Sequence, residues 1–334
     1  MAYILGGSSS ESSGFEKAIA NFAIRAVHES TGLVNMTTVV TPTQGNVFEI
    51  PIFAPITYQD YNPAGAGGNV QGNASEQNPA LGQNSITASP TVAATAFDIF
   101  YGWTTAFNLA SSLGAELGDS YAEKVDQRVA AAFGGFKATV SNTLYSPTPA
   151  DGFARPTALG AMELRAEGAT GGTPTAGFTA LTVLELVRLV KQNWKNARLS
   201  GSPVIVLDTQ ASMTRMLGEL TGGAVSTSGG SNLSDLGNEL LRSGRIENVY
   251  GCQVMFSTFL TTASRSVAGG AAENVFVGAY FGDQALYTVL KQGLDIKMGE
   301  KPGGLQMWLT GIGYFGSGVG DLRRGGAINV ELVA

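Results

Sequence analysis

Histidine and cysteine are almost absent from this 334-residue chain, which contains one of each. A single cysteine, Cys252, cannot form an internal disulfide, so the sequence does not imply an oxidising compartment. Cys252 lies in the run YGCQVMF and is expected to be a small core hydrophobe. His28 is expected to be a solvated residue near a helix end. Because zinc sites draw on clustered cysteine and histidine, and no carboxylates are grouped either, we expect neither a metal site nor a cofactor.

Charge is also scarce. Charged residues make up 14% of the chain, against roughly 25% in an ordinary soluble domain. There are 20 Lys and Arg against 26 Asp and Glu, a net charge of −6, which argues against a dedicated nucleic-acid-binding protein. A surface with so little charge must be covered by neutral polar groups or buried against partners. The 45 glycines indicate that neutral groups cover part of it, and burial against partners is expected as well.

Long apolar runs are missing as well. No stretch of about 18 apolar residues exists, so we expect no membrane span. The first 14 residues, MAYILGGSSSESSG, carry no basic segment followed by an apolar one, unlike a signal peptide. We therefore expect the protein to fold in a reducing cytoplasm.

One string imitates a nucleotide site. GIGYFG, from Gly311 to Gly316, matches G-x-G-x-x-G, and Glu331 follows Gly311 by twenty residues. Such a site needs a helix N-terminus directly after the glycines, whereas here a Gly-rich stretch and then a strand follow. A nucleotide-dependent enzyme using Gly311, Gly313 and Gly316 remains an alternative, but we expect a bulged strand and no enzyme.

The segment from 15 to 29 predicts a short amphipathic helix, with Phe15, Ile19 and Phe22 on one face. This helix would pack either on its own core or on a neighbouring copy. Residues 1–14, which precede it, are small and polar and are expected to be mobile.

Residues 36–97 predict an extended β-hairpin. Apolar, β-branched arms flank a neutral tip from Tyr61 to Asn84, which is too long for an ordinary loop. Because a lone two-stranded ribbon is marginal in water, we expect support from another copy of the chain, with Tyr58 and Tyr61 as aromatic anchors. The alternative is a disordered insertion in a monomer.

A long helix is predicted from Ala115 to Phe136, with Leu117, Tyr121, Val125 and Phe133 on its buried face. Its acids Asp119, Glu123 and Asp126 alternate with Lys124 and Arg128, which is typical of a solvated, ion-paired face.

The rest of the chain alternates helices and strands. Residues 141–178 are expected to be loop-like. The predicted elements that follow are helices at 179–197, 212–220 and 235–241, strands at 204–208, after Gly244, at 275–281, 294–298 and 305–315 and at the C-terminus, and a short helix after Asp283.

This order of parts resembles the major capsid proteins of tailed double-stranded DNA bacteriophages with the Hong Kong 97-type fold. The likeness is carried by GNVFEIPIF, GDSYAEKVDQRVAAAF and PVIVLDTQASMTRML. It implies an α+β fold with an N-arm, an extended β-hairpin E-loop, a long spine helix in a peripheral domain and an α/β apical domain. The implied divisions are N-arm 1–35, E-loop 36–97, peripheral domain 98–178, apical domain 179–262 and a C-terminal return to the peripheral domain 263–334.

The resemblance also implies a function. Hexamers and pentamers of one subunit would form an icosahedral capsid that encloses double-stranded DNA, assembled in the host cytoplasm and ending in the virion. Expected partners are many copies of the chain itself, scaffolding, portal and cement proteins, and packaged DNA contacted non-specifically. The candidate inter-subunit contacts are Phe15, Phe22, Phe48, Tyr58 and Tyr61.

Two points qualify the resemblance. No lysine or arginine lies between Arg25 and Lys124, so the lysine-based covalent links of some family members cannot start from this E-loop. An encapsulin-like nanocompartment shell, which shares the fold, remains an alternative; its shells would hold a cargo enzyme, whereas a viral shell would hold DNA.

Overall fold

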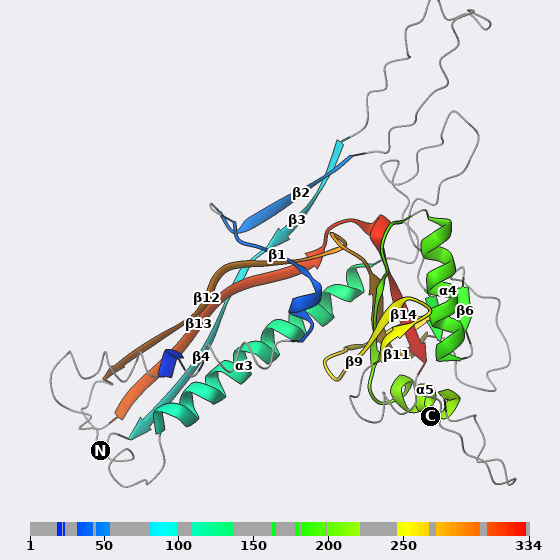
Figure 1. The fold of residues 1–334 in the computed structure, drawn as a ribbon. Helices are drawn as coiled ribbons and strands as arrows, with labels where there is room; N and C mark the ends of the chain where they lie inside the picture. Colours follow the sequence, from blue (N-terminus) through cyan, green and yellow to red (C-terminus); the bar gives the residue numbers. More distant parts are fainter. Residues whose placement is uncertain are drawn as a thin grey trace, which may run out of the picture.

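The computed structural model describes residues 19–21, 23, 32–42, 45–53, 81–98, 109–136, 162–164, 178–180, 182–197, 199–220, 246–266, 272–300 and 306–331. These residues form a mixed α+β structure. Figure 1 shows an elongated sheet with one long helix beneath it, and beside its end a second sheet with shorter helices.

The elongated sheet has the strand order β1-β12-β13-β4. Its strands are β1 Thr38–Val40, β12 Leu286–Glu300, β13 Gln306–Val319 and β4 Ser89–Asp98. β1 runs parallel to β12, and the other pairs are antiparallel. The short helix predicted after Asp283 is wrong. A turn in which the Ala285 N–H donates to Gly282 O (3.2 Å) leads directly into β12.

The long helix α3 covers one face of this sheet. It spans Leu109–Ala132 and continues as a 3-10 turn, η2, over Phe133–Gly135. The helix therefore begins six residues before the predicted start. The predicted apolar face is confirmed, because Leu117, Val125 and Phe133 are buried.

The second sheet has the order β6-β5-β14-β11-β7-β9-β8, with β10 also paired to β11. Its strands are β5 Met162–Leu164, β6 Phe178–Ala180, β7 Val204–Asp208, β8 Ile246–Val249, β9 Cys252–Ser257, β10 Thr262–Ser266, β11 Ala272–Phe281 and β14 Gly325–Glu331. The 3-10 turns η1 Val34–Met36 and η3 Leu322–Arg324 precede β1 and β14.

Helices α4, Val183–Asn196, and α5, Ser212–Leu220, belong to this second part. The predicted helix at 212–220 is confirmed, and the one at 179–197 begins later because residues 178–180 form β6. The Glu219 carboxylate accepts hydrogen bonds from the Val183 and Leu184 N–H groups, at 2.6 and 2.9 Å. This carboxylate satisfies two donors at the start of α4 that have no partner within the helix. Cys252 is fully buried in this core, as predicted.

Two predictions for this part were incomplete. The segment 141–178, expected to be loop-like, contains β5 and the first residue of β6. Three-residue strands are too short to show a period. The segment after Gly244, expected to be a turn and one strand, is a hairpin of β8 and β9. The helix predicted at 235–241 lies outside the described residues, as does His28.

The strands on either side of residue 262 share one sheet. β11 pairs with β7 on one edge and with β14 on the other. The chain passes from β11 in the second sheet to β12 in the first, and returns from β13 to β14. These crossings help to tie the two parts together, and the predicted boundary at 262 does not separate two sheets.

Candidate assembly surfaces

A two-stranded hairpin leaves the elongated sheet. It consists of β2, Val47–Phe53, and β3, Leu81–Thr87, paired from Val47 with Thr87 to Phe53 with Leu81. The predicted hairpin is confirmed in this range, and Figure 1 shows it pointing away from the body. Its predicted extent, 36–97, is corrected. β1 and β4 are not arms of the hairpin, because they pair with β12 and β13.

Polar contacts fix the hairpin to the body. The side-chain amide of Asn84 donates to Gly320 O at 2.6 Å, and Lys291 Nζ donates to Asn46 Oδ1 at 2.8 Å. The Ala88 N–H donates to Asn46 O at 2.8 Å and closes the base of the hairpin. Asn84 on β3 and Asn46, the residue before β2, are thus tied to β12 and to the end of β13.

An apolar contact lies beside these bonds. Ile50 and Ile86 are buried with Val289, and the rings of Phe48 and Tyr287 are tilted, with centroids 6.3 Å apart. A Cβ on Gly318 would lie 2.9 Å from Ile86 Cγ1, so glycine is needed for this approach.

Phe48, one of five predicted inter-subunit contacts, is therefore half-buried in its own subunit, and its contact with a neighbour stays a prediction. The other four, Phe15, Phe22, Tyr58 and Tyr61, lie outside the described residues.

The residues near the N-terminus pack on the subunit's own core. Ile19 and Ala23 are fully buried in a cluster with Leu117, Met307 and Leu309. Of the two alternatives for the predicted helix at 15–29, the described positions therefore support packing on its own core.

Asp126 of α3 anchors the chain before β1. Its side chain is 2% exposed, and its two carboxylate oxygens accept hydrogen bonds from the Gly32 and Val34 N–H groups at 3.0 and 3.2 Å. The predicted solvated, ion-paired face is therefore wrong at Asp126. The spacing of acids and bases on the helix gave no sign of a partner 92 residues earlier.

Arg128 also departs from that predicted face. Its Nη1 donates to Phe315 O at 2.6 Å and to Ser89 O at 3.3 Å, and its guanidinium carbon lies 4.6 Å from the centre of the Phe315 ring. The arginine therefore joins α3 to the first residue of β4 and to the part of β13 where its Gly-rich end begins.

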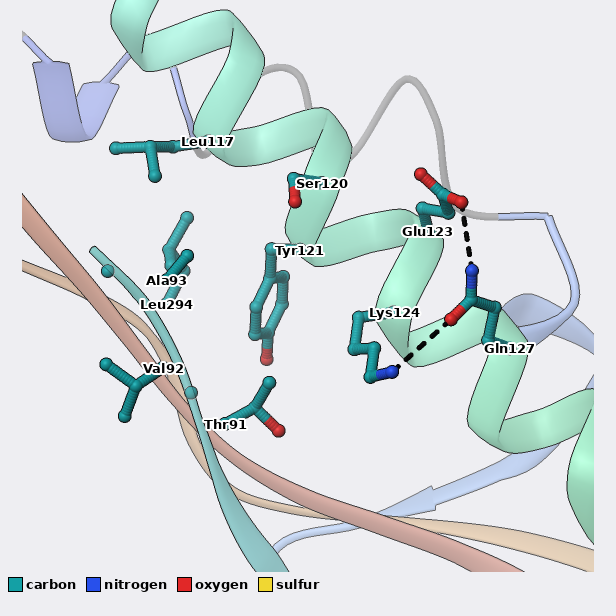
Figure 2. Close-up of a pocket in the computed structure, with 12 residues that line it drawn as sticks. Thr91, Val92, Ala93, Leu117, Ser120, Tyr121, Glu123, Lys124, Gln127 and Leu294 are labelled. Carbon is teal, nitrogen blue, oxygen red and sulfur yellow. Dashed lines mark hydrogen bonds between the residues drawn. The ribbon is translucent and has the colours of Figure 1, made fainter. Parts of the chain in front are cut away.

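A groove of about 330 Å³ runs between α3 and β4. Figure 2 shows Tyr121 pointing from the helix towards Thr91, with Glu123, Gln127 and Lys124 along the helix side. Gln127 Nε2 donates to Glu123 Oε1 at 2.9 Å, and Lys124 Nζ donates to Gln127 Oε1 at 3.4 Å. Burial raises the pKa of the Tyr121 phenol.

The string GIGYFG lies within β13, so no helix follows its glycines and no nucleotide cradle forms. The glycines serve packing instead. A Cβ on Gly313 would overlap the Tyr121 ring, and one on Gly316 would overlap Thr87 O. β13 pairs with β4 without a break, and the bulges that interrupt the sheet lie in its other partner, β12, after Leu290.

The face of the elongated sheet opposite α3 carries exposed apolar side chains. Trp308 and Val92 are 36% and 60% exposed. Trp308 covers Gly299 on β12, where a Cβ would lie 2.6 Å from Trp308 Cζ2. Lys297 Nζ lies 3.9 Å from Asp295 Oδ2 on β12, and both of these side chains are exposed. This face is a second candidate contact surface.

Among the described residues, no group of three or more histidine, cysteine, aspartate or glutamate side chains could hold a metal ion. None of the described helices is both long and apolar enough to cross a membrane.

Of the comparisons with known proteins, the one with solved structures found matches. No protein-family model and no curated protein matches the sequence. Solved structures match over most of their length. The capsid structure of cyanophage P-SCSP1u has 18% identity and a TM-score of 0.59, covering 89% of this chain and 87% of the other. The mature capsid of bacteriophage PhiM1 has 15% identity and a TM-score of 0.60, covering 91% and 88%.

The capsid of Ralstonia phage GP4 also matches, with 13% identity and a TM-score of 0.59, covering 90% of this chain and 87% of that one. The chain therefore has the fold of tailed-phage capsid proteins, as the resemblance in the sequence predicted.

Proposed function

We propose that this chain is the major capsid protein of a tailed double-stranded DNA virus with Hong Kong 97-type architecture. The observation that carries the proposal is the match in fold to phage capsid proteins over about nine-tenths of the chain. A role as a building unit and not as an enzyme also agrees with the glycine string in β13, which packs against α3 and the hairpin.

The subunits would assemble as hexamers and pentamers into an icosahedral shell around the genome. The hairpin supports this, because a two-stranded ribbon is marginal alone and this one has its described contacts with the body near its base. It would lie on an adjacent subunit, where Tyr58 and Tyr61 would be buried. Phe15 and Phe22 would contact a neighbour through the N-arm.

Low charge fits the same proposal, since the cores of protein interfaces are depleted in charge. With no lysine or arginine between Arg25 and Lys124, the E-loop cannot supply a lysine for a covalent link. The mature shell would be held without covalent bonds between subunits, with scaffolding, portal and cement proteins as further partners. The packaged DNA would be contacted non-specifically.

Electron microscopy and sedimentation of the purified protein test the proposal. Closed particles of uniform diameter are expected, and denaturing gels of them should show one band near 34.5 kDa without a ladder. Particles purified from infected cells should protect genome-length DNA from nuclease. A monodisperse monomer at high concentration would overturn the proposal, and particles filled with one enzyme would favour the nanocompartment alternative.

A further inference from the structure

Strand β4 forms one edge of the elongated sheet. Within the described part of the chain it pairs only with β13, in unbroken register from Ser89 with Phe315 to Asp98 with Gln306. Val92 to Ala96 are all exposed. Proteins usually protect such an edge with charges, prolines or bulges. Here no charge lies between Pro90 and Asp98, and no bulge interrupts the strand.

Pro90 indicates which backbone groups face outward. Proline has no N–H, so in an edge strand its nitrogen faces away from the neighbouring strand. Backbone direction alternates along a strand, so the N–H and C=O groups of Val92, Ala94 and Ala96 also face the open edge. Those of Thr91, Ala93 and Thr95 face β13. The edge therefore presents three consecutive hydrogen-bonding positions.

The side chains of β4 divide into two rows. Thr91, Ala93 and Thr95 are paired with Gly313, Gly311 and Leu309 and lie on the face that α3 covers. Val92, Ala94 and Ala96 are paired with Ile312, Thr310 and Trp308 and lie on the opposite face. The row on the α3 side has small side chains, two of them with hydroxyl groups. The row on the opposite face has small apolar side chains. Neither row carries a charge that would repel an identical strand.

We propose that β4 pairs antiparallel with β4 of a second copy of this chain, around a two-fold axis at Ala93. This proposal rests on the proposed function, because it names one contact through which copies of the subunit meet. Val92 then lies opposite Ala94 of the partner subunit and exchanges backbone hydrogen bonds with it. Thr91 lies opposite Thr95 of the partner subunit. Of the possible symmetric registers, this one places threonine opposite threonine twice and apolar residues opposite each other.

The groove beside β4 supports this register. Thr91 Oγ1 and the Tyr121 hydroxyl are both shielded from solvent and have no hydrogen-bond partner among the described residues. A buried hydroxyl without a partner destabilises the folded state. Opposed threonines on neighbouring strands can hydrogen-bond to each other, so the second strand would bring a partner to the side of the groove where Thr91 lies (Figure 2).

Disulfide trapping tests the axis. In the proposed pairing, Ala93 of each copy forms a pair without backbone hydrogen bonds, whose Cα atoms are about 4.5 Å apart, within disulfide range. Mild oxidation of Ala93→Cys shells should convert most of the protein to a dimer of twice the subunit mass. Ala94→Cys is the matched control, because the two introduced thiols would be diagonal neighbours about 7–8 Å apart. Wild-type protein oxidised in the same way controls for dimers formed through Cys252, which is fully buried.

A mixture of Val92→Cys and Ala94→Cys subunits should also form a mixed dimer, since these positions are opposed. Ala93→Cys shells without a dimer band would overturn the pairing, and equal yields from Ala93→Cys and Ala94→Cys would overturn the register. If the wild-type protein forms no shells, the proposed function fails. The pairing would still be tested by oxidising concentrated soluble Ala93→Cys protein: a disulfide-linked dimer on the gel would support it, and the absence of that dimer would overturn it.

Discussion

Asp126, in the C-terminal half of α3, accepts a hydrogen bond from the backbone N–H of Val34 at 3.2 Å. The same carboxylate accepts the Gly32 N–H at 3.0 Å, so one side chain holds the chain where it enters η1 and β1. A helix residue thereby positions the segment that leads into the elongated sheet.

Replacing Asp126 with Asn should lower the free energy of unfolding by about 2 kcal/mol. Hydrogen bonds to a charged group contribute about 1.5–3 kcal/mol, and the amide nitrogen of Asn cannot accept the second N–H. Urea unfolding of the soluble subunit measures the loss. The control is Glu123→Gln on the exposed side of α3, where a change within about 0.5 kcal/mol is expected. Equal losses in the two variants would contradict the anchoring role.

Replacing Gly313 with Ala should destabilise the subunit by about 1–3 kcal/mol, the usual cost of overpacking. The added Cβ would overlap the Tyr121 ring, which lies against the Phe315 ring with centroids 5.4 Å apart. Gly293→Ala is the control, since a Cβ there meets nothing within 4 Å. Thermal melting of both variants checks this. A loss at Gly293 as large as that at Gly313 would show that packing under α3 is not the cause.

Replacing Asn84 with Ala should reduce the yield of shells while the subunit stays folded. The variant loses the hydrogen bond to Gly320 O, a contribution of about 1 kcal/mol, and with it one attachment that sets the direction of the hairpin. Gln83→Ala, at the exposed neighbouring position, is the matched control. Circular dichroism reports the fold and sedimentation reports assembly. Normal assembly of the Asn84 variant would mean that the remaining contacts suffice.

Stability should fall in alkali, in part through Tyr280. Burial raises the pKa of this phenol far above its usual value, and the hydrogen bond from the Asn193 amide lowers it only in part. The unfolded phenol ionises near pH 10. The folded state keeps its proton at higher pH, so the contribution is complete below about pH 10 and is lost as the pH rises beyond it.

Tyr280→Phe tests this contribution, because it removes the ionisable group and leaves Tyr121 and Tyr287, whose pKa values are also raised. Urea unfolding at pH 8 and pH 11 should show a larger loss for the wild-type protein than for the variant. Equal losses would assign the alkaline effect to other groups.

Several features could be predicted from the sequence. The buried face of α3, the strand at 204–208 and the helix at 212–220 appeared as predicted, because each is encoded by a local pattern of apolar residues, periodic in the helices and continuous in the strand. The hairpin was visible as two apolar arms around a neutral tip. Its extent was overestimated, because β1 and β4 have the same β-rich composition as the arms.

Other features depend on partners that are distant in the sequence. Asp126 looked like a surface acid until the fold placed Gly32 and Val34 beside it. GIGYFG lacked the following helix that a phosphate site needs, but only the tertiary structure showed that its glycines pack against Tyr121 and Thr87. The sequence by itself determined most of the longer helices and strands, since that information is local. Only the tertiary structure decided which strand each one pairs with and what each glycine and acid contacts, because those contacts arise from close packing between segments that local periodicity does not relate.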